Sequence, residues 1–522
     1  MALLRSIATV GGFTMASRVL GFARDMLTAA ILGAGPVADA FFVAFKLPNF
    51  FRRLFAEGAF NAAFVPQFSG RLAAEGEAPA LRFATEVLSV LLSVLFVFVT
   101  LLQIFMPALM YVFAPGFADQ PVKFNLAIEL SRLTFPYLLF ISLVSLLGGV
   151  LNSLNRFAAA AATPIVLNIT LIGAMLFATP FLPTPGHALA WGVAAAGIGQ
   201  FLWMVIACHR AGVHLSLPRP RLTPAVKRLL RLMVPGAIGA GVVQINLLID
   251  TMIASLLPTG AVSFLYYADR INELPVGVIG IAVGTALLPV LSRQIRTGEE
   301  AAAHHSMNRA LEFALFLTVP AAAALIVIGE PIIAVLFQRG AFGAHEAAAT
   351  GAALKAFSLG LPAYVLVKVL GPGFFAREDT ATPVKLAVVC VVANVAISLT
   401  LIQFLAHVGI ALATATTAWL NAGMMWTILH RRRHYAIDAR LRRRGARILA
   451  AAAGMAGGLW LGMMAVEPWL AARGPARWIA LGVLVAGGAA LYAALVLAFR
   501  AADWADLARL VPRRFRRTGS GA

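Results

Sequence analysis

The chain has 522 residues, of which 61% are hydrophobic and 12% are charged, and its formal net charge is +20. Soluble domains are about 45–50% apolar and about 25% charged, so this composition excludes a soluble enzyme and indicates a polytopic membrane protein. The basic excess does not indicate a nucleic-acid partner, because a basic cytoplasmic rim is the rule for such chains.

Apolar windows of about 20 residues, the length that crosses a bilayer as a helix, recur along the whole chain. They predict an all-α fold of about 14 transmembrane helices, joined by loops too short for a catalytic domain. The phosphate-loop, HExxH and paired CxxC motifs do not occur, so we expect no enzymatic activity, no metal and no cofactor. The expected spans are residues 6–32, 36–58, 84–113, 123–151, 158–180, 187–208, 225–256, 261–292, 310–337, 348–375, 382–404, 408–429, 445–466 and 478–499.

The basic residues of the loops predict the orientation in the membrane. With the N-terminus in the cytoplasm, 29 arginines and lysines fall in inner segments, whereas 4 fall in outer segments. Those 4 are Lys123, Arg339, Arg473 and Arg477. Both termini are therefore expected in the cytoplasm, and the basic tail at 513–517 is expected to touch anionic lipid.

The first two expected helices carry seven charged residues within otherwise apolar sequence. One charge near the centre of a bilayer helix costs about 2.5–3.5 kcal/mol, so these side chains are not expected to face lipid. Asp39, Lys46 and Arg53 are spaced by seven and share a helical face, and Glu57 follows Arg53 by four residues. We infer a watered cavity whose net positive charge suits an anionic cargo; for Arg52 and Arg53, snorkelling to the headgroups is the alternative. The seven residues are Arg18, Arg24, Asp25, Asp39, Lys46, Arg52 and Arg53.

The second half of the chain has one comparable cluster, formed by Asp269, Arg270 and Glu273. It predicts a second cationic contribution to the cavity, and a local ion pair that holds helices together is the alternative. Asp250 is a deep acid without an adjacent cation in the sequence. It fits either a coupling-ion site or an interhelical hydrogen bond.

A weak internal repeat relates the two halves of the first twelve expected helices. Pro48 and Pro275 are offset by 227 residues, and Pro66 and Pro289 by 223, a difference of about one helical turn. A repeat of six helices preserves orientation, so we expect two lobes related by a pseudo-two-fold axis along the membrane normal. The expected domains are 1–215 and 216–432 for the lobes, and 433–522 for two additional helices and a basic cytoplasmic tail.

Long stretches of the chain closely resemble the MurJ (MviN) lipid II flippases, of the multidrug/oligosaccharidyl-lipid/polysaccharide exporter superfamily. The most specific are 17–25 (SRVLGFARD), 39–49 (DAFFVAFKLPN) and 52–60 (RRLFAEGAF), and similar runs occur at 114–119 and 266–270. The resemblance covers nearly the whole chain and thins out after about residue 430.

This resemblance implies a function in peptidoglycan synthesis, and so in cell-wall biogenesis and cell shape. The family moves lipid II, an undecaprenyl diphosphate that carries a disaccharide-pentapeptide, from the inner to the outer leaflet of the bacterial cytoplasmic membrane. Its essential cavity arginines match Arg18, Arg24, Arg52 and Arg270 here, and its essential acid matches Asp39. The expected partners are lipid II, membrane lipids and cell-wall assembly proteins. The expected substrate-binding residues are Arg18, Arg24, Asp39, Lys46, Arg52 and Arg270, with Ser17, Asp25, Asn49, Arg53, Glu57 and Asp269 as supporting polar residues.

The last two expected helices, 445–466 and 478–499, carry no embedded charge and are rich in glycine. They are predicted to handle the polyprenyl tail, and structural bracing is the alternative.

Three other functions stay open at this point. They are a scaffold for a cell-wall assembly complex, a membrane transferase that acts on polyprenyl phosphates, and a flippase for another polyprenyl-diphosphate-linked oligosaccharide. The transferase is disfavoured because its metal-binding acids are scarce in the expected inner loops.

Overall fold

The structure is a computed structural model that describes residues 2–54, 60–472 and 474–501. Within helices, the side chains at 2–8, 235–240, 242–243, 278–279 and 281–286 are not described. The described chain forms seventeen α-helices and no sheet, with a single isolated bridge between Arg339 and Phe342. The predicted all-α class is therefore confirmed.

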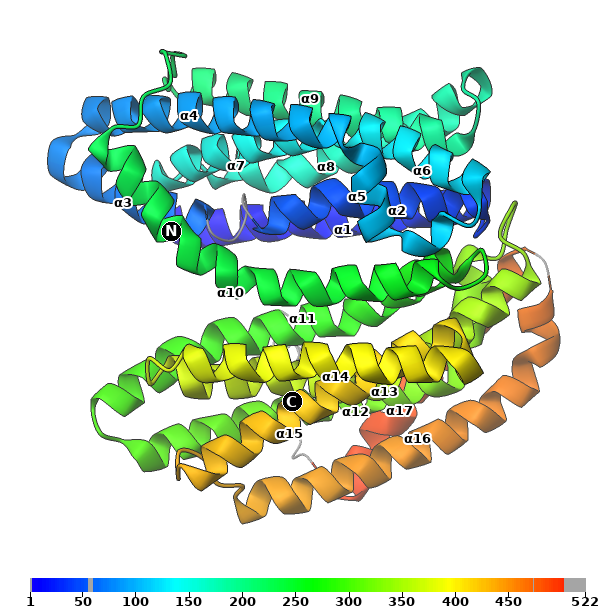
Figure 1. The fold of residues 1–522 in the computed structure, drawn as a ribbon. Coiled ribbons are helices and arrows are strands. Elements are labelled where there is room, and N and C mark those ends of the chain that lie inside the picture. Colours follow the sequence, from blue (N-terminus) through cyan, green and yellow to red (C-terminus); the bar gives the residue numbers. More distant parts are fainter. Residues whose placement is uncertain (1, 55–59, 473, 502–522) are drawn as a thin grey trace, which may run out of the picture. The chain divides into compact units, whose positions relative to one another are not determined.

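The chain divides into two compact units, which Figure 1 draws with each helix labelled. Unit 1 comprises residues 1–264 and 337–346, and unit 2 comprises 265–336 and 347–522. These units are defined by packing, whereas the lobes at 1–215 and 216–432 were inferred from the repeat and stay a prediction.

The first ten helices belong to unit 1. In Figure 1, α4, α7, α8 and α9 run side by side, and α1 packs on α8 while α2 packs on α6. Short 3-10 or π-helical turns follow α5 and α8: η2 (Pro115–Phe117), η3 (Ala174–Ala178) and η4 (Thr179–Phe181). The helices are α1 (Ala2–Leu32), α2 (Pro36–Phe51), α3 (Asn61–Glu75), α4 (Glu77–Ile104), α5 (Met106–Phe113), α6 (Pro121–Thr134), α7 (Tyr137–Ser153), α8 (Phe157–Gly173), α9 (Pro185–Arg210) and α10 (Pro224–Ser255).

The remaining seven helices lie largely in unit 2. Its core joins α11, α12, α13 and α15 through Leu291, Met307, Phe374 and Leu429, all at most 1% exposed. The helices are α11 (Ala261–Arg296), α12 (Glu300–Phe337), α13 (Ala344–Phe375), α14 (Ala381–Leu405), α15 (His407–Arg431), α16 (Ala439–Ala471) and α17 (Pro475–Ala498).

Each of the fourteen predicted spans coincides with one helix or with two consecutive helices, such as α6 and α7 within 123–151. Among the described residues, nine stretches are long and apolar enough to cross a membrane, and one of them, Ala381–Arg431, contains both α14 and α15. The chain is thus a multi-pass membrane protein. The count of fourteen crossings stays a prediction for α1, α2, α10 and α11.

Helix α3 was not predicted, and this is an error of the sequence reading. Its Ala63, Phe64 and Phe68 are buried, while the polar Gln67, Ser69 and Arg71 are half-buried. The helix is therefore amphipathic and too polar to be found by apolar windows. The Phe64 ring stacks on Phe68 of the same helix and on Phe83 of α4. These stacked rings pack α3 against α4.

Local sequence sets where several helices start. Proline occupies the first turn of α2, α6, α9, α10 and α17, where its missing N–H costs nothing. Thr184 and Thr223 accept the N-cap hydrogen bonds of α9 and α10, and Asp438 accepts that of α16 from the Leu441 N–H at 2.6 Å. Inside α12 the backbone leaves helical geometry at Ile328, just before Pro331, because the proline cannot complete the helical ladder.

The additional helices α16 and α17 pack closely against each other and against α12. Ile448 and Met455 of α16 lie in one buried cluster with Ile328, and Tyr492 donates to the Phe316 carbonyl at 2.8 Å. A Cβ at Gly458 would overlap Leu491 of α17, so this glycine permits the close approach. The same holds for Gly454 and Gly488, and a Cβ at Gly462 would lie 3.1 Å from Leu484 Cδ2. A Cβ at Gly457, Gly482 or Gly487 would meet no atom within 4 Å.

Candidate functional site

In unit 1, Arg24 on α1 lies in a buried polar cluster. Arg24 is 7% exposed, and its Nη2 and Nε donate to Asp25 Oδ1 at 2.7 and 3.1 Å. Its Nη1 donates to Asn168 Oδ1 on α8 at 3.0 Å, and the Asn168 amide donates to the Ser17 carbonyl at 3.0 Å. Three predicted residues, Ser17, Arg24 and Asp25, are thus brought together around Asn168, which the sequence did not single out. A single asparagine in the apolar run of α8 was the available signal.

Asp39 forms a second buried cluster and is 1% exposed. It accepts from Lys123 Nζ on α6 at 2.8 Å, from the Gly260 N–H at 2.8 Å, and from Ser263 N–H and Oγ at 3.0 and 2.6 Å. The carboxylate therefore caps the first turn of α11, where free N–H groups and the helix dipole favour an anion. Lys123, counted above as an outer-loop charge, is 3% exposed and lies over the Phe117 ring.

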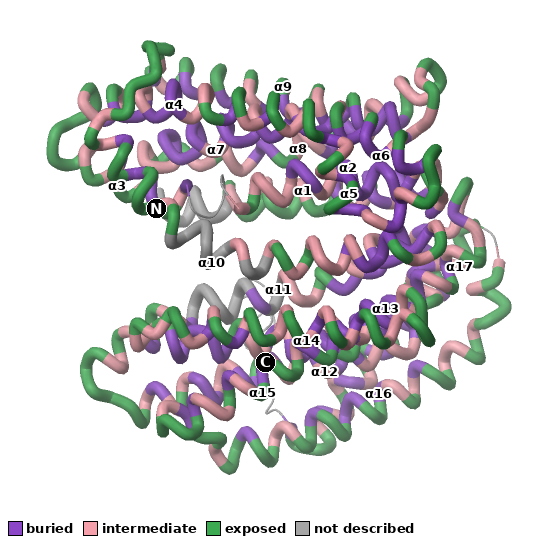
Figure 2. Tube along the Cα trace, in the orientation of Figure 1, coloured by how far each residue is buried: buried purple, intermediate pink, exposed green. Residues whose placement is uncertain are grey.

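Close backbone approaches surround this end of unit 1. The Ala341 N–H donates to the Ala30 carbonyl at 2.8 Å, which ties the α12–α13 connection to α1. Gly33 (φ +65°) and Gly340 (φ +57°) sit in this contact, and a Cβ on either would overlap the facing backbone. Asp39 and this glycine contact lie at the end of unit 1 that the orientation argument predicts to be outer, and Figure 2 colours much of α2 and α6 as buried.

Farther along α2, polar side chains are less buried. Lys46 is half-buried, and its Nζ donates to Thr251 Oγ1 on α10 at 2.9 Å. Arg52 is half-buried as well, and its Nε donates to Asn49 Oδ1 at 3.1 Å. Each of these two cations thus donates to a neutral side-chain oxygen, whereas Arg24 donates to the Asp25 carboxylate.

Three further predicted residues take different positions. Arg18 on α1 and Arg53 just beyond α2 are exposed. Glu57 lies outside the described residues.

In unit 2, the predicted cluster lies on α11. Asp269 and Arg270 are half-buried, and the Arg270 Nη1 is 3.4 Å from Glu273 Oε2 one turn later. Lys368 on α13 was not predicted as a site residue. A Cβ at Gly280 of α11 would lie 2.5 Å from its Cδ, so the lysine stem packs on this glycine.

These groups suit the binding of an anion more than covalent chemistry. The apolar helices α1 and α2 carry six basic residues within or next to them and two acids, and each acid forms an ion pair with a cation. Among the described residues no three histidine, cysteine or acidic side chains gather as for a metal ion.

Comparison with solved structures identifies the fold. The fold matches a lipid II flippase MurJ in an inward closed conformation, with a TM-score of 0.79, 24% identity, and coverage of 94% of this chain and 98% of that one. It also matches an inward-facing multidrug resistance MATE transporter of the MOP superfamily, with a TM-score of 0.61, 14% identity, and coverage of 81% and 98%. The chain therefore has the same fold as these two transporters.

Comparison with known sequences identifies the family. The model of the family "Lipid II flippase MurJ" matches residues 28–495. A probable lipid II flippase MurJ of Rhizobium tropici is 48% identical over 88% of this chain and 86% of its own length. One from Rhizobium meliloti (strain 1021) is 46% identical over 98% and 97%. The chain therefore belongs to the lipid II flippase MurJ family, which confirms the resemblance seen in its sequence.

Proposed function

We propose that this protein moves lipid II from the inner to the outer leaflet of the bacterial cytoplasmic membrane. The observation that carries the proposal is the set of basic side chains embedded in apolar helices of a chain of this family, with Arg24 7% exposed within α1. A diphosphate is strongly anionic, and guanidinium groups bind it through paired, charge-assisted hydrogen bonds. We assign this binding to Arg18, Arg24, Lys46, Arg52 and Arg270.

The transport cycle in this proposal is alternating access. Asp39 holds the start of α11, so opening unit 1 at the predicted outer end requires the Asp39 contacts with Gly260 and Ser263 to break. We therefore assign two roles to Asp39, this contact with the start of α11 and the binding of the cargo. The open sides of α16 and α17 at Gly457, Gly482 and Gly487 are proposed to accommodate the polyprenyl tail, because Gly454, Gly458, Gly462 and Gly488 are used in packing between the two helices.

The direct test is complementation of a strain depleted of its own lipid II flippase, with lipid II on the outer face detected by a membrane-impermeant probe. We expect the wild-type chain and Arg82→Ala to restore growth and outer-face lipid II, since Arg82 is exposed at the start of α4. Arg24→Ala should fail at equal expression. Growth restored only in a strain that lacks a flippase for another polyprenyl-diphosphate-linked oligosaccharide would favour that alternative cargo.

The proposed orientation has both termini in the cytoplasm. Single cysteines in 216–222, introduced after Cys208 and Cys390 are replaced by serine, should be protected from an impermeant reagent added outside. Cysteines in 183–186 should react. Labelling of 216–222 from outside contradicts the orientation.

A further inference from the structure

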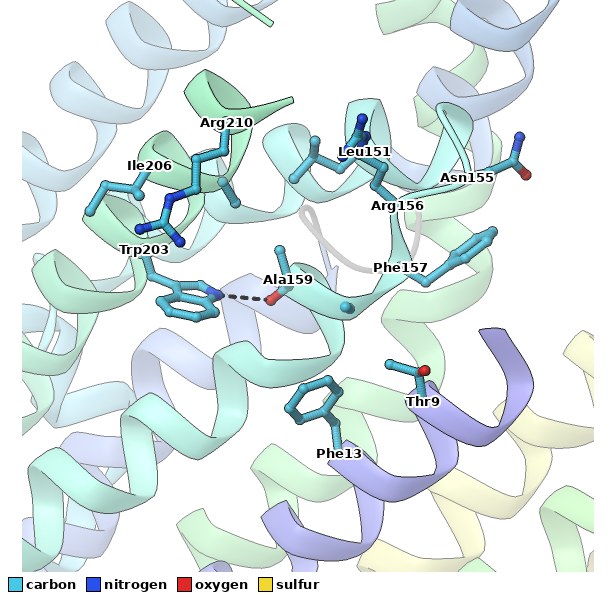
Figure 3. A pocket seen from close by; sticks show the side chains of 12 residues that line it. Thr9, Phe13, Leu151, Asn155, Arg156, Phe157, Ala159, Trp203, Ile206 and Arg210 are labelled. Atoms are coloured by element: carbon cyan, nitrogen blue, oxygen red, sulfur yellow. Dashed lines mark hydrogen bonds between the residues drawn. The ribbon is translucent and has the colours of Figure 1, made fainter. Parts of the chain in front are cut away.

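Unit 1 contains a cavity of about 530 Å³ that the charged clusters above do not include (Figure 3). It lies between the first turns of α1, the α7–α8 turn and the end of α9, and its walls include Phe13, Phe157 and Trp203. Two arginines line it, Arg156 and Arg210, and both are exposed. Among the described residues no carboxylate pairs with either of them, so the cavity has two uncompensated positive charges.

The ends of two helices position these arginines. After α7, Asn155 adopts a left-handed conformation (φ +61°), and the Arg156 N–H donates to the Leu151 carbonyl at 2.8 Å. This C-terminal motif directs the chain sharply into α8. Arg210 is the last residue of α9, and in Figure 3 its side chain extends toward Trp203, whose Nε1 donates to the Ala159 carbonyl at 3.1 Å.

Unit 2 repeats this construction with a different charge. After α13, Glu378 is left-handed (φ +62°), and the Asp379 N–H donates to the Phe374 carbonyl at 3.1 Å. Asp379 therefore occupies the position that Arg156 has after α7. It accepts from Arg432 Nη1 at 2.6 Å, and Arg432 follows α15 directly. An internal ion pair thus connects the two helix ends in unit 2.

In unit 1 the two corresponding helix ends both carry an arginine. Arg210 is the last residue of α9, whereas Arg432 is the first residue after α15. Cations at helix C-termini interact favourably with the helix dipole, which accounts for either arginine taken alone. It does not account for the replacement of the acid by a second cation beside a cavity. An anion from outside the chain would connect Arg156 and Arg210 as Asp379 connects with Arg432.

We propose that this cavity binds the phosphate group of an anionic glycerophospholipid. The two guanidinium groups would hold the phosphodiester, and the apolar walls at Phe13 and Trp203 would lie along the glycerol and the first acyl carbons. Tryptophan and arginine are both characteristic of the headgroup level of a bilayer, which fits the expected inner end of α9. This site goes beyond the proposed transport, because it is a separate cavity and holds a structural lipid.

The test is lipid binding by the purified full-length protein, measured by native mass spectrometry during titration with phosphatidylglycerol. Arg156→Asp recreates the charge arrangement of unit 2, so it should pair with Arg210 and no longer need the lipid. We expect its affinity for the first phosphatidylglycerol to fall about tenfold or more, the equivalent of one charge-assisted hydrogen bond. Its melting temperature without lipid should not fall, and the melting temperature should no longer rise when phosphatidylglycerol is added.

Two controls keep the result specific. Arg219→Asp makes the same charge change in the exposed loop after α9, outside the cavity, and should bind phosphatidylglycerol as the wild type does. Arg156→Gln combined with Arg210→Gln should lose the lipid without forming the new ion pair. An equal loss in Arg219→Asp, or equal binding of soluble glycerol 3-phosphate and phosphatidylglycerol by the wild type, would overturn the proposal.

Discussion

Replacement of Asp39 by asparagine is expected to destabilise unit 1 strongly. The carboxylate accepts four hydrogen bonds and is 1% exposed, and its partner Lys123 is 3% exposed. Asparagine keeps the volume but leaves a buried ammonium group without a counter-charge, which costs about 3–5 kcal/mol. The Phe117 ring lies 4.1 Å from Lys123 Nζ in the wild type already, so this cation–π contact does not compensate for the lost carboxylate. We therefore expect a destabilisation of about 3–5 kcal/mol.

The measurement is a double-mutant cycle by thermal or denaturant unfolding of the purified protein. Asp39→Asn, Lys123→Met and the double variant are compared with the wild type, and a coupling energy of about 2 kcal/mol is expected between the two residues. Asp119→Asn is the matched control, because Asp119 is exposed in the turn just before α6. If Asp39→Asn were no more harmful than Asp119→Asn, or if the double variant showed no coupling, the charge argument would be wrong.

Three further changes test other parts of the molecule. Arg24→Lys and Arg270→Lys should each reduce lipid II translocation at equal expression, because lysine lacks the planar fork, and full activity of the double variant would contradict this. Gly458→Leu should lower the melting temperature, at a cost of about 1–3 kcal/mol, because Leu491 fills the space, whereas Gly487→Leu should leave it unchanged. Hydrogen bonds from Thr382, followed by the contact with Arg432, lower the pKa of Asp379 from 3.8 to about 2. Its stabilisation is thus fully present above about pH 4 and lost as the pH falls through about 2, so the stability difference between Asp379→Asn and wild type should disappear over that interval.

The sequence predicted the spans well because the bilayer imposes one simple requirement, a long apolar helix. It could not predict which residues meet across the bundle. Arg24 pairs with Asn168 at a separation of 144 residues, and Ser263 reaches Asp39 across 224. Helical spacing identifies a face, but it says nothing of which neighbour covers that face.

The stripe on α2 shows the same limit along the helix axis. Their spacing predicted one shared face for Asp39, Lys46 and Arg53, yet Asp39 is buried, Lys46 is half-buried, and Arg53 lies just beyond α2 and is exposed. Seven residues advance a helix by about 10.5 Å, enough to leave one packing environment and enter another. The position of each residue along the axis therefore decides its role as much as its face does.

The boundaries between the two compact units fall inside helices. The chain passes from one unit to the other at 264/265 within α11, at 336/337 at the end of α12, and at 346/347 within α13. No flexible linker lies at these points, so proteases should find no cleavage site there. A chimaera in which one whole unit comes from a relative would need three junctions, each inside a helix. Fragments of the chain that are cut at these junctions should not reassemble. The two compact units of this protein are therefore not segments of the chain that can be exchanged or separated independently.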